Sequence, residues 1–249
     1  MTKTDQAVVI TGGTSGIGLA TAGLLHEQGV SVMVTGRTEE SVARARTQLP
    51  AEVIVTRADA ASVEDNTRVA REAEAAFGSL TGAFLNAGIM ESAPVESMSE
   101  DTWERLFAIN AKGPFFALQK LLPLMGEGAS VVFTVGIGAR RGMPGGSAAA
   151  GSRGALLTMI PSLAVELAPR GIRVNAVSPG PIDTPILAKS GMGPEQIAAV
   201  KQSFADALPL RRMGRPEEVA ETVAFLLSQR SSFITGEDIL VGGGAGLNV

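Results

Sequence analysis

Short apolar runs alternate with helical patterns along the whole chain. The runs are rich in β-branched residues and show little polar alternation, as is typical of strands buried on both faces of a parallel sheet. Seven strands are predicted, at Ala7–Thr11, Ser31–Thr35, Val53–Thr56, Ala83–Asn86, Ser130–Val135, Arg173–Val177 and Ile239–Val241. Six helices are predicted between them, at Gly16–Gln28, Glu39–Gln48, Ser62–Phe77, Thr102–Met125, Ala148–Leu167 and Pro216–Ser228.

This alternation of strands and helices predicts an α/β fold with a doubly wound parallel sheet and right-handed crossovers. The length of 249 residues suits one domain, and no linker or repeat interrupts the pattern. The least regular stretch, residues 185–210, has three prolines, two glycines and a helical middle. We expect it to form a lid over a substrate site.

Composition excludes several classes of function. With 25 acidic against 21 basic residues the net charge is −4, whereas a nucleic-acid surface usually needs a basic face. Cysteine is absent and His26 is the only histidine, so disulfides, thiolate chemistry and a metal site are not expected. The apolar runs are too short for a signal peptide or a membrane span. These features predict a cytoplasmic protein that binds neither nucleic acid nor membrane.

A glycine-rich segment follows the first predicted strand and opens the first helix. Glycines let the backbone approach a pyrophosphate closely, and the helix N-terminus offers unpaired N–H groups to it. A merely structural turn is the alternative. The predicted cofactor contacts in this segment are Gly12, Thr14, Ser15, Gly16, Ile17 and Gly18.

The end of the second predicted strand indicates which dinucleotide binds. An NAD-binding protein usually has an acid there for the ribose 2′-hydroxyl, but this chain has Gly36 followed by Arg37. A planar guanidinium suits the oxygens of a 2′-phosphate. We therefore expect NADP (NADPH) rather than NAD, the alternative being that Arg37 is only a solvated loop residue.

Further motifs carry a resemblance to a known family. These motifs are the Gly-x3-Gly-x-Gly spacing, Asn86-Ala87-Gly88, Asn110 within Ile109–Gly113, Arg173–Gly180 and Phe233–Glu237. Together they resemble the short-chain dehydrogenase/reductase family over nearly the whole chain. The resemblance implies a Rossmann-like fold and places Asn86, Ala87 and Gly88 in the cofactor site.

The same resemblance implies roles for two more segments. Asp59, followed by Ala60, resembles the acid that accepts a hydrogen bond from the adenine amino group. Asp59 could instead cap the next helix, although Ser62 is better placed to do so. The segment implied to hold the nicotinamide carboxamide contributes Pro179, Gly180, Ile182 and Thr184.

The family's usual catalytic residues have no match in this chain. The family uses Ser, Tyr and Lys, with the last two spaced Tyr-x3-Lys. Alignment of this region places Gly136 at the serine position, Ala149 at the tyrosine position and Arg153 at the lysine position. No tyrosine exists anywhere in the chain, so a shift of register cannot supply one. Asn110 and Arg153 remain as catalytic candidates, and Arg153 is also expected to bind the ribose hydroxyls.

Other side chains near the expected site have ordinary alternatives. Arginine at the lysine position is also found in halohydrin dehalogenases, but those relatives use serine and tyrosine and have given up the dinucleotide. Possible hydroxyl donors are Thr134, Ser147 and Ser152, which are also suited to core or capping roles. Arg140 and Arg141 could face an anionic substrate or be solvated. Loop residues that could line an apolar pocket or merely fill gaps are Met90, Met143, Met192 and Met213.

The sequence therefore predicts one Rossmann-like domain over residues 1–249, with sheet order 3-2-1-4-5-6-7 and helices on both faces. The predicted function is an NADP-binding oxidoreductase of this family with a noncanonical or impaired proton relay. The alternative is a catalytically inactive, cofactor-binding regulatory or structural subunit. The substrate of the predicted oxidoreductase is an unidentified small molecule. Family resemblance implies that the protein is a homo-oligomer, with a homotetramer as the form expected by family analogy.

Overall fold

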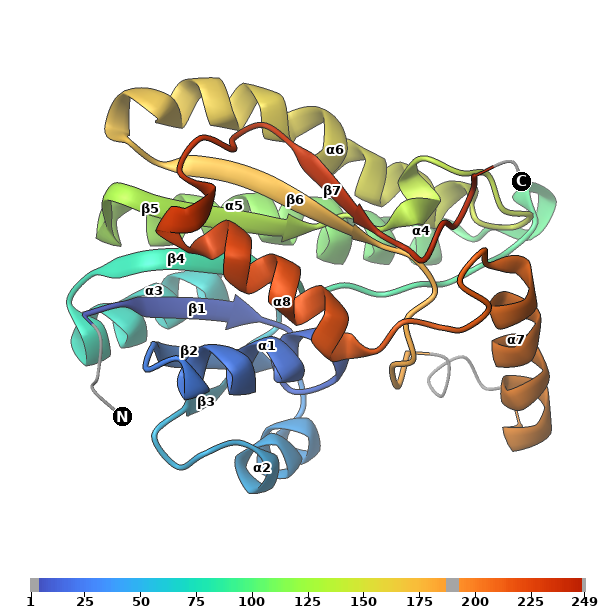
Figure 1. The fold of residues 1–249 in the computed structure, drawn as a ribbon, viewed down its shortest axis with the longest axis horizontal. Helices are drawn as coiled ribbons and strands as arrows, with labels where there is room; N and C mark the ends of the chain where they lie inside the picture. Colours follow the sequence, from blue (N-terminus) through green and yellow to red (C-terminus); the bar gives the residue numbers. More distant parts are fainter. Residues whose placement is uncertain (1–4, 187–192, 248–249) are drawn as a thin grey trace.

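The computed structural model describes residues 5–186 and 193–247 of the chain. Its centre is a seven-stranded sheet in the order β3-β2-β1-β4-β5-β6-β7, which confirms the predicted order (Figure 1). All neighbouring strands pair in parallel. The strands are β1 Ala7–Thr11, β2 Ser31–Gly36, β3 Ile54–Arg57, β4 Leu80–Leu85, β5 Met125–Thr134, β6 Arg173–Pro179 and β7 Asp238–Val241. The helices are α1 Gly16–Glu27, α2 Glu39–Gln48, α3 Val63–Phe77, α4 Glu100–Phe107, α5 Gly113–Leu121, α6 Ser147–Leu167, α7 Pro194–Ala207 and α8 Pro216–Leu227.

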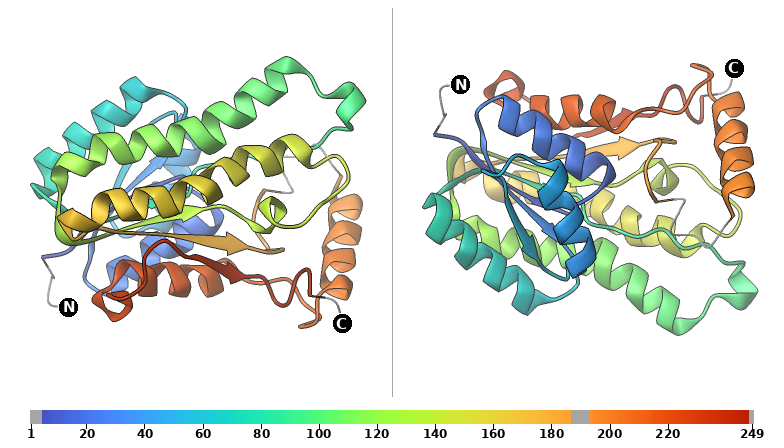
Figure 2. Two further views of the ribbon diagram at one scale, coloured as in Figure 1. Left: turned by 90° about the horizontal axis from the view of Figure 1, so that it is seen from above. Right: turned by 90° about the horizontal axis from the view of Figure 1, so that it is seen from below.

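Hydrophobic cores form on both faces of the sheet. Successive side chains of a strand point to opposite faces, and accordingly Val131 of β5 lies in one core and Val132 in the other. The first core contains Ile160 of α6, and α3 and α5 cover the same face. The second contains Leu25 of α1 and Val223 of α8. Figure 2 shows the two sets of helices on opposite sides of the sheet, as predicted for a doubly wound fold.

The prediction of one continuous helix over Thr102–Met125 is wrong. The chain forms α4, then a π-helical turn at Ala108–Lys112, and then α5. A short 3-10 turn follows α5, and Met125 already belongs to β5. The interruption lies where Asn110 turns its side chain toward the backbone of Ile89. A π turn accommodates such a tertiary contact by widening the helix locally.

The least regular stretch of the sequence contains α7. Residues 187–192, which include Met192, lie outside the described residues. The helical middle predicted for residues 185–210 is present as α7, which leads into a turn bonded from Leu210 N–H to the Gly243 carbonyl at 3.3 Å. A lid function for this stretch stays a prediction.

One helix in the described part of the chain, Ser147–Arg170, is long and apolar enough to cross a membrane by length and composition alone. A core helix of a soluble protein passes the same test. Leu156 and Ile160 of α6 are each 1% exposed and belong to the core beside β6. Within the most apolar 18-residue window of this helix, 33% is buried inside the fold.

Candidate active site

The glycine-rich loop between β1 and α1 folds tightly against the loop after β4. A methyl group on Gly12 would lie 2.8 Å from the Cα atom of Ala87, and one on Gly18 would lie 2.4 Å from the carbonyl oxygen of Gly12. Backbone atoms cannot move aside easily, so both positions need glycine. Ser15, at the N-cap of α1, makes no side-chain capping bond. The unpaired first-turn N–H groups of α1 and this hydroxyl form a donor set suited to a pyrophosphate.

Two other residues of this loop lie beside segments that the sequence predicted for the same site. A methyl group on Gly36 would lie 2.4 Å from the Thr14 side chain, so the loop lies at the end of β2. A methyl group on Gly16 would lie 3.2 Å from the Thr184 side chain, so the segment after β6 reaches the start of α1. The structure therefore brings together the loops after β1, β2 and β6.

Asn86 joins three strand ends through hydrogen bonds. Its amide nitrogen donates to the carbonyl oxygen of Gly12 at 3.1 Å, and its amide oxygen accepts from the hydroxyl of Thr134 at 3.0 Å. The backbone N–H groups of Asn86 and Ala87 both donate to the Thr11 hydroxyl oxygen at 3.1 Å. These bonds fix the relative positions of β1, β4 and β5 at their carboxyl ends.

Arg153 extends this network from α6. Its Nη1 donates to the carbonyl oxygen of Thr134 at 2.7 Å, and its Nη2 donates to that of Ala87 at 3.3 Å. A methyl group on Gly88 would lie 1.5 Å from Nη2, so glycine there makes room for the guanidinium. Burial lowers the pKa of Arg153 to about 10. The side chain therefore stays protonated at neutral pH, with carbonyl oxygens rather than a carboxylate as its partners.

A pocket of about 270 Å³ opens beside Arg153, and we call it the central pocket. Gly136 and Ala149 line it without contributing a polar side-chain atom. Gly136 has a φ of 100°, a conformation that residues with a side chain rarely adopt. The predicted cofactor residues that line the central pocket are Ile17, Gly88, Arg153, Pro179, Gly180, Ile182 and Thr184.

Asn110 is fully buried behind the central pocket and does not line it. Its amide oxygen accepts from the N–H of Ile89 at 2.9 Å, and its amide nitrogen donates to the carbonyl of Ile89 and the hydroxyl of Ser152, both at 3.0 Å. The hydroxyl of Ser152 in turn donates to the Ala149 carbonyl at 2.8 Å. These bonds position the loop after β4 against α6, and a catalytic role for Asn110 stays a prediction.

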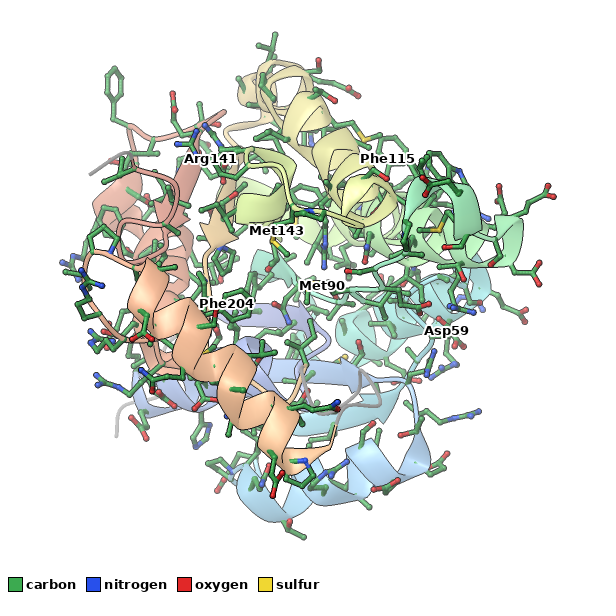
Figure 3. All side chains as sticks on the ribbon, turned by 90° about the vertical axis from the view of Figure 1, so that its right-hand side faces the viewer. Asp59, Met90, Phe115, Arg141, Met143 and Phe204 are labelled. Atoms are coloured by element: carbon green, nitrogen blue, oxygen red, sulfur yellow. The ribbon has the colours of Figure 1, made fainter. Side chains whose placement is uncertain are left out.

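Asp59 lies at the opposite end of the predicted cofactor site. Figure 3 shows it well apart from Met90 and Met143, which lie at the central pocket. One oxygen of Asp59 accepts from the N–H of Ala61 at 2.9 Å, next to Ala60. The cap of α3 is Ser62, as expected, so Asp59 is not needed for capping.

Arg37 is the residue that the sequence predicts to determine the choice of cofactor. Arg37 is exposed at the end of β2 and makes no ion pair with another described residue. It directly follows Gly36, where an added methyl group would meet the Thr14 side chain, so Arg37 lies at the sheet edge beside the loop after β1. This position fits contact with a charged group on the adenosine half of a dinucleotide.

The walls of the central pocket come from several distant segments. Met90, Met143 and Met213 line it, whereas Met192 lies outside the described residues. Sequence reasoning missed Phe204 of α7 and Ile186, which also line it. The apolar spacing of Val200 and Phe204 along α7 is the signal that could have indicated such a face.

The structure separates the two adjacent arginines after β5. Arg140 forms an ion pair with Asp238 at 2.7 Å, and the carboxyl of Asp238, whose side chain is 3% exposed, also accepts from the Ser178 hydroxyl. Arg141 instead lines the central pocket. Arg140 therefore anchors the loop after β5 to β7, and Arg141 is the arginine available to a ligand.

Few polar side chains face the central pocket. They are Ser92, Thr134, Arg141, Arg153 and Thr184. Across residues 5–186 and 193–247, no group of three or more His, Cys, Asp or Glu side chains is arranged to hold a metal ion. The pocket therefore offers two cationic side chains and a few hydroxyl groups for chemistry.

The fold and the loops at its carboxyl edge define a Rossmann-type dinucleotide-binding protein. A family model described as "Enoyl-(Acyl carrier protein) reductase" matches residues 12–246. The chain is 35% identical to a cyclohexanol dehydrogenase of Acinetobacter sp. over 245 residues, which cover 96% of this chain and 94% of that protein. It is also 35% identical to a levodione reductase of Leifsonia aquatica, with coverage of 97% and 94%.

Solved structures agree with these relatives. A short-chain dehydrogenase/reductase from Brucella melitensis, titled a glucose/ribitol dehydrogenase, matches with a TM-score of 0.91 and 33% identity, covering 99% of this chain and 98% of that chain. A levodione reductase structure matches with a TM-score of 0.91 and 31% identity, with coverage of 97% and 98%. The protein belongs to the short-chain dehydrogenase/reductase family. Membership implies oxidoreductase chemistry with a nicotinamide cofactor, NAD or NADP.

Proposed function

We propose that this protein is an NADP(H)-dependent oxidoreductase whose proton transfer does not follow the family's Ser-Tyr-Lys route. The observation that carries the proposal is the composition of the central pocket. It is lined by cofactor-binding segments of the family, by Arg153, and by Gly136 and Ala149, which have no ionisable group. The chain has no tyrosine to add. The nicotinamide cofactor would supply or accept the hydride.

NADP is the proposed cofactor because of Arg37. Its guanidinium lies free at the end of β2, and Gly36 brings no carboxylate that would repel a phosphate. Ser15 and the α1 N-terminus would hold the pyrophosphate, and Asp59 would accept from the adenine amino group. Arg153 would donate to the ribose hydroxyls at the other end of the cofactor.

The proposed proton source is water or the substrate itself. The Thr134 hydroxyl already donates to Asn86, and the buried Ser152 hydroxyl donates to the Ala149 carbonyl. Ser147 is exposed and does not line the central pocket. Arg153 stays cationic at neutral pH, so its part is to attract and stabilise a developing negative charge rather than to release a proton.

A titration with NADPH and NADH, followed by a broad screen of ketones and alcohols, tests this function. We expect tight NADPH binding and turnover of a restricted set of substrates. Binding of NADPH without turnover of any substrate would instead support the cofactor-binding regulatory or structural subunit. That alternative draws on the same cofactor residues but lacks support from the relatives, which are dehydrogenases and reductases by name.

The proposed form in the cell is a cytoplasmic homotetramer. Val165 of α6 is 77% exposed, and Phe115 of α5 is 36% exposed, so both helices present apolar side chains on the outside of the subunit. Such faces are suited to packing across a two-fold axis. Light scattering at micromolar concentration checks the assembly, and a monomer would reject it.

A further inference from the structure

We infer that the central pocket selects substrates that carry an anionic group on an apolar body, and that Arg141 pairs with that group. The inference rests on the proposed oxidoreductase function, because it names the substrate class of the same site. The observation behind it is that the charge of the pocket lining differs in sign from the net charge of the whole protein. The protein has more acids than bases, 25 against 21, yet the residues that line this pocket include two arginines and no acid.

The acids nearest the pocket in the chain are paired elsewhere. Glu91 lies between two lining residues but forms an ion pair with Arg105. Asp183 also lies between two lining residues and pairs with Lys201 at 2.6 Å. Neither carboxylate is therefore available to neutralise Arg141.

Arg141 is exposed, and it lines the central pocket. Its backbone N–H donates to the carbonyl of Ile137 at 3.0 Å, in the turn that the Arg140–Asp238 ion pair anchors. A methyl group on Gly246 would lie 2.3 Å from Arg141 Nε, so the guanidinium passes directly over the backbone of the C-terminal segment. In Figure 3 Arg141 lies on the side of Met143 and far from Asp59, away from the adenosine end of the site.

The start of α6 adds to the positive potential. Gly146 caps this helix, and Ala149 and Ala150 of its first turns line the pocket. The first turn contains no acid, so the positive end of the helix dipole is not neutralised there. Two arginines and a helix N-terminus thus face one cavity whose remaining walls are mostly apolar.

Chemistry limits the ligand to an amphipathic anion. A wholly polar anion would gain nothing from Met90, Met143 and Phe204, and a neutral apolar compound would leave Arg141 without a partner. An apolar chain or ring that ends in a carboxylate, sulfonate or phosphate can pack against the apolar side chains and also pair with Arg141. Its carbonyl or alcohol group would then lie toward Arg153 and the cofactor.

Calorimetry on the NADPH-bound protein tests the inference with octanoate and its neutral counterpart octanamide. We expect octanoate to bind at least about tenfold more tightly, as a charge-assisted contact supplies. Arg141→Gln should remove this preference and leave octanamide unchanged, while Arg141→Lys should retain part of it. Arg71→Gln is the matched control, since Arg71 is an exposed arginine of α3 outside the pocket.

The result that overturns the inference is equal affinity for the two ligands, no binding of either, or a preference that survives Arg141→Gln. Octane-1-sulfonate in the same series distinguishes a general anion site from one that favours a carboxylate. None of these measurements needs turnover. An inactive protein that binds octanoate through Arg141 would therefore reject the proposed oxidoreductase function and keep the anion site.

Discussion

The loops after β1 and β4 and the loops after β5 and β6 use their side chains in opposite ways. Around Gly12 and Asn86, both ends of the Asn86 amide are hydrogen-bonded, and backbone atoms lie too close for a methyl group on Gly12 or Gly18. Around Gly136 and Ala149, the chain instead leaves an open pocket with few polar atoms. The proposed cofactor-binding loop and the proposed site of proton transfer thus lie in regions that differ in packing and in polar groups.

The largest effect is expected where the first region is most crowded. Gly18→Ala should destabilise the protein by roughly 3 kcal/mol and abolish NADPH binding, because the new methyl group would overlap backbone atoms. Gly23→Ala in the same helix is the control, since nothing lies within 4 Å of the added atom. It should be neutral or stabilising by up to about 1 kcal/mol. Urea denaturation compares the two, and equal stability would contradict the tight loop.

Glycine spacing predicts the loop between β1 and α1 well because part of what it requires is local. The close approach of Gly12 and Gly18 depends on a strand, a turn and a helix that follow one another in the chain. The parallel strands were equally visible because both their faces are buried. The sequence pattern therefore predicted the strands and the position of the glycine-rich loop, and the order of the strands was stated with the family resemblance.

Other features depend on contacts between distant segments, which leave no local pattern. The π turn at Asn110 follows from bonds to Ile89 and Ser152, which are 21 and 42 residues away. Likewise, Arg140 and Arg141 make different contacts because Arg140 pairs with Asp238 of β7. Such features require the folded chain, so the sequence could only leave both arginines as candidates.

Restoring the family's groups is the next test, and it acts on the second region. The triple change Gly136→Ser, Ala149→Tyr and Arg153→Lys should raise NADPH-dependent reduction of cyclohexanone by roughly 100-fold, because general acid catalysis is worth about that much. Each single change should do little, since these groups act as a unit. The same triple with phenylalanine at position 149 is the control, because it adds the ring without the hydroxyl.

The structure adds an obstacle to this restoration. Gly136 has a φ of 100° and a ψ of 149°, so serine there is strained by about 1–3 kcal/mol even though the nearest atom to its Cβ, the Pro179 carbonyl oxygen, is 4.0 Å away. A crystal structure of the triple variant should show whether the loop relaxes. If the wild type already reduces cyclohexanone at about 10 s⁻¹, a rate typical of enzymes, the idea of an altered proton route is wrong.

A smaller effect is expected at Arg37, which follows β2 and is proposed to determine the choice of cofactor. Arg37→Ala should weaken NADPH by about 1.5–3 kcal/mol through loss of a charge-assisted contact, and should leave NADH nearly unchanged. Fluorescence titration with both cofactors measures this. Arg71→Ala removes an equally exposed charge from α3 and should change neither affinity. Equal affinity of the wild-type protein for NADPH and NADH would reject the assignment.

The smallest effect concerns the support of Asp59, which is proposed to bind the adenine amino group. The carboxylate of Asp65 accepts from the Asp59 N–H at 2.7 Å, and this bond, with help from Arg68, lowers the pKa of Asp65 below 3.8. The ionised form is therefore favoured in the folded protein, so its contribution is present above about pH 4 and is lost as the pH falls through the lowered pKa. The contribution is modest because the side chains of Asp65 and Arg68 are partly exposed.

Asp65→Asn should accordingly be less stable than the wild type at pH 7, and the two unfolding curves should converge as the pH falls below about 4. Urea titrations at a series of pH values measure the difference. Glu72→Gln is the matched control, because Glu72 also pairs with Arg68 but makes no bond to Asp59. A deficit that is the same at every pH would mean that the charge of Asp65 does not matter. A deficit equal to that of Glu72→Gln would mean that Asp65 acts only through Arg68 and not by holding the backbone at Asp59.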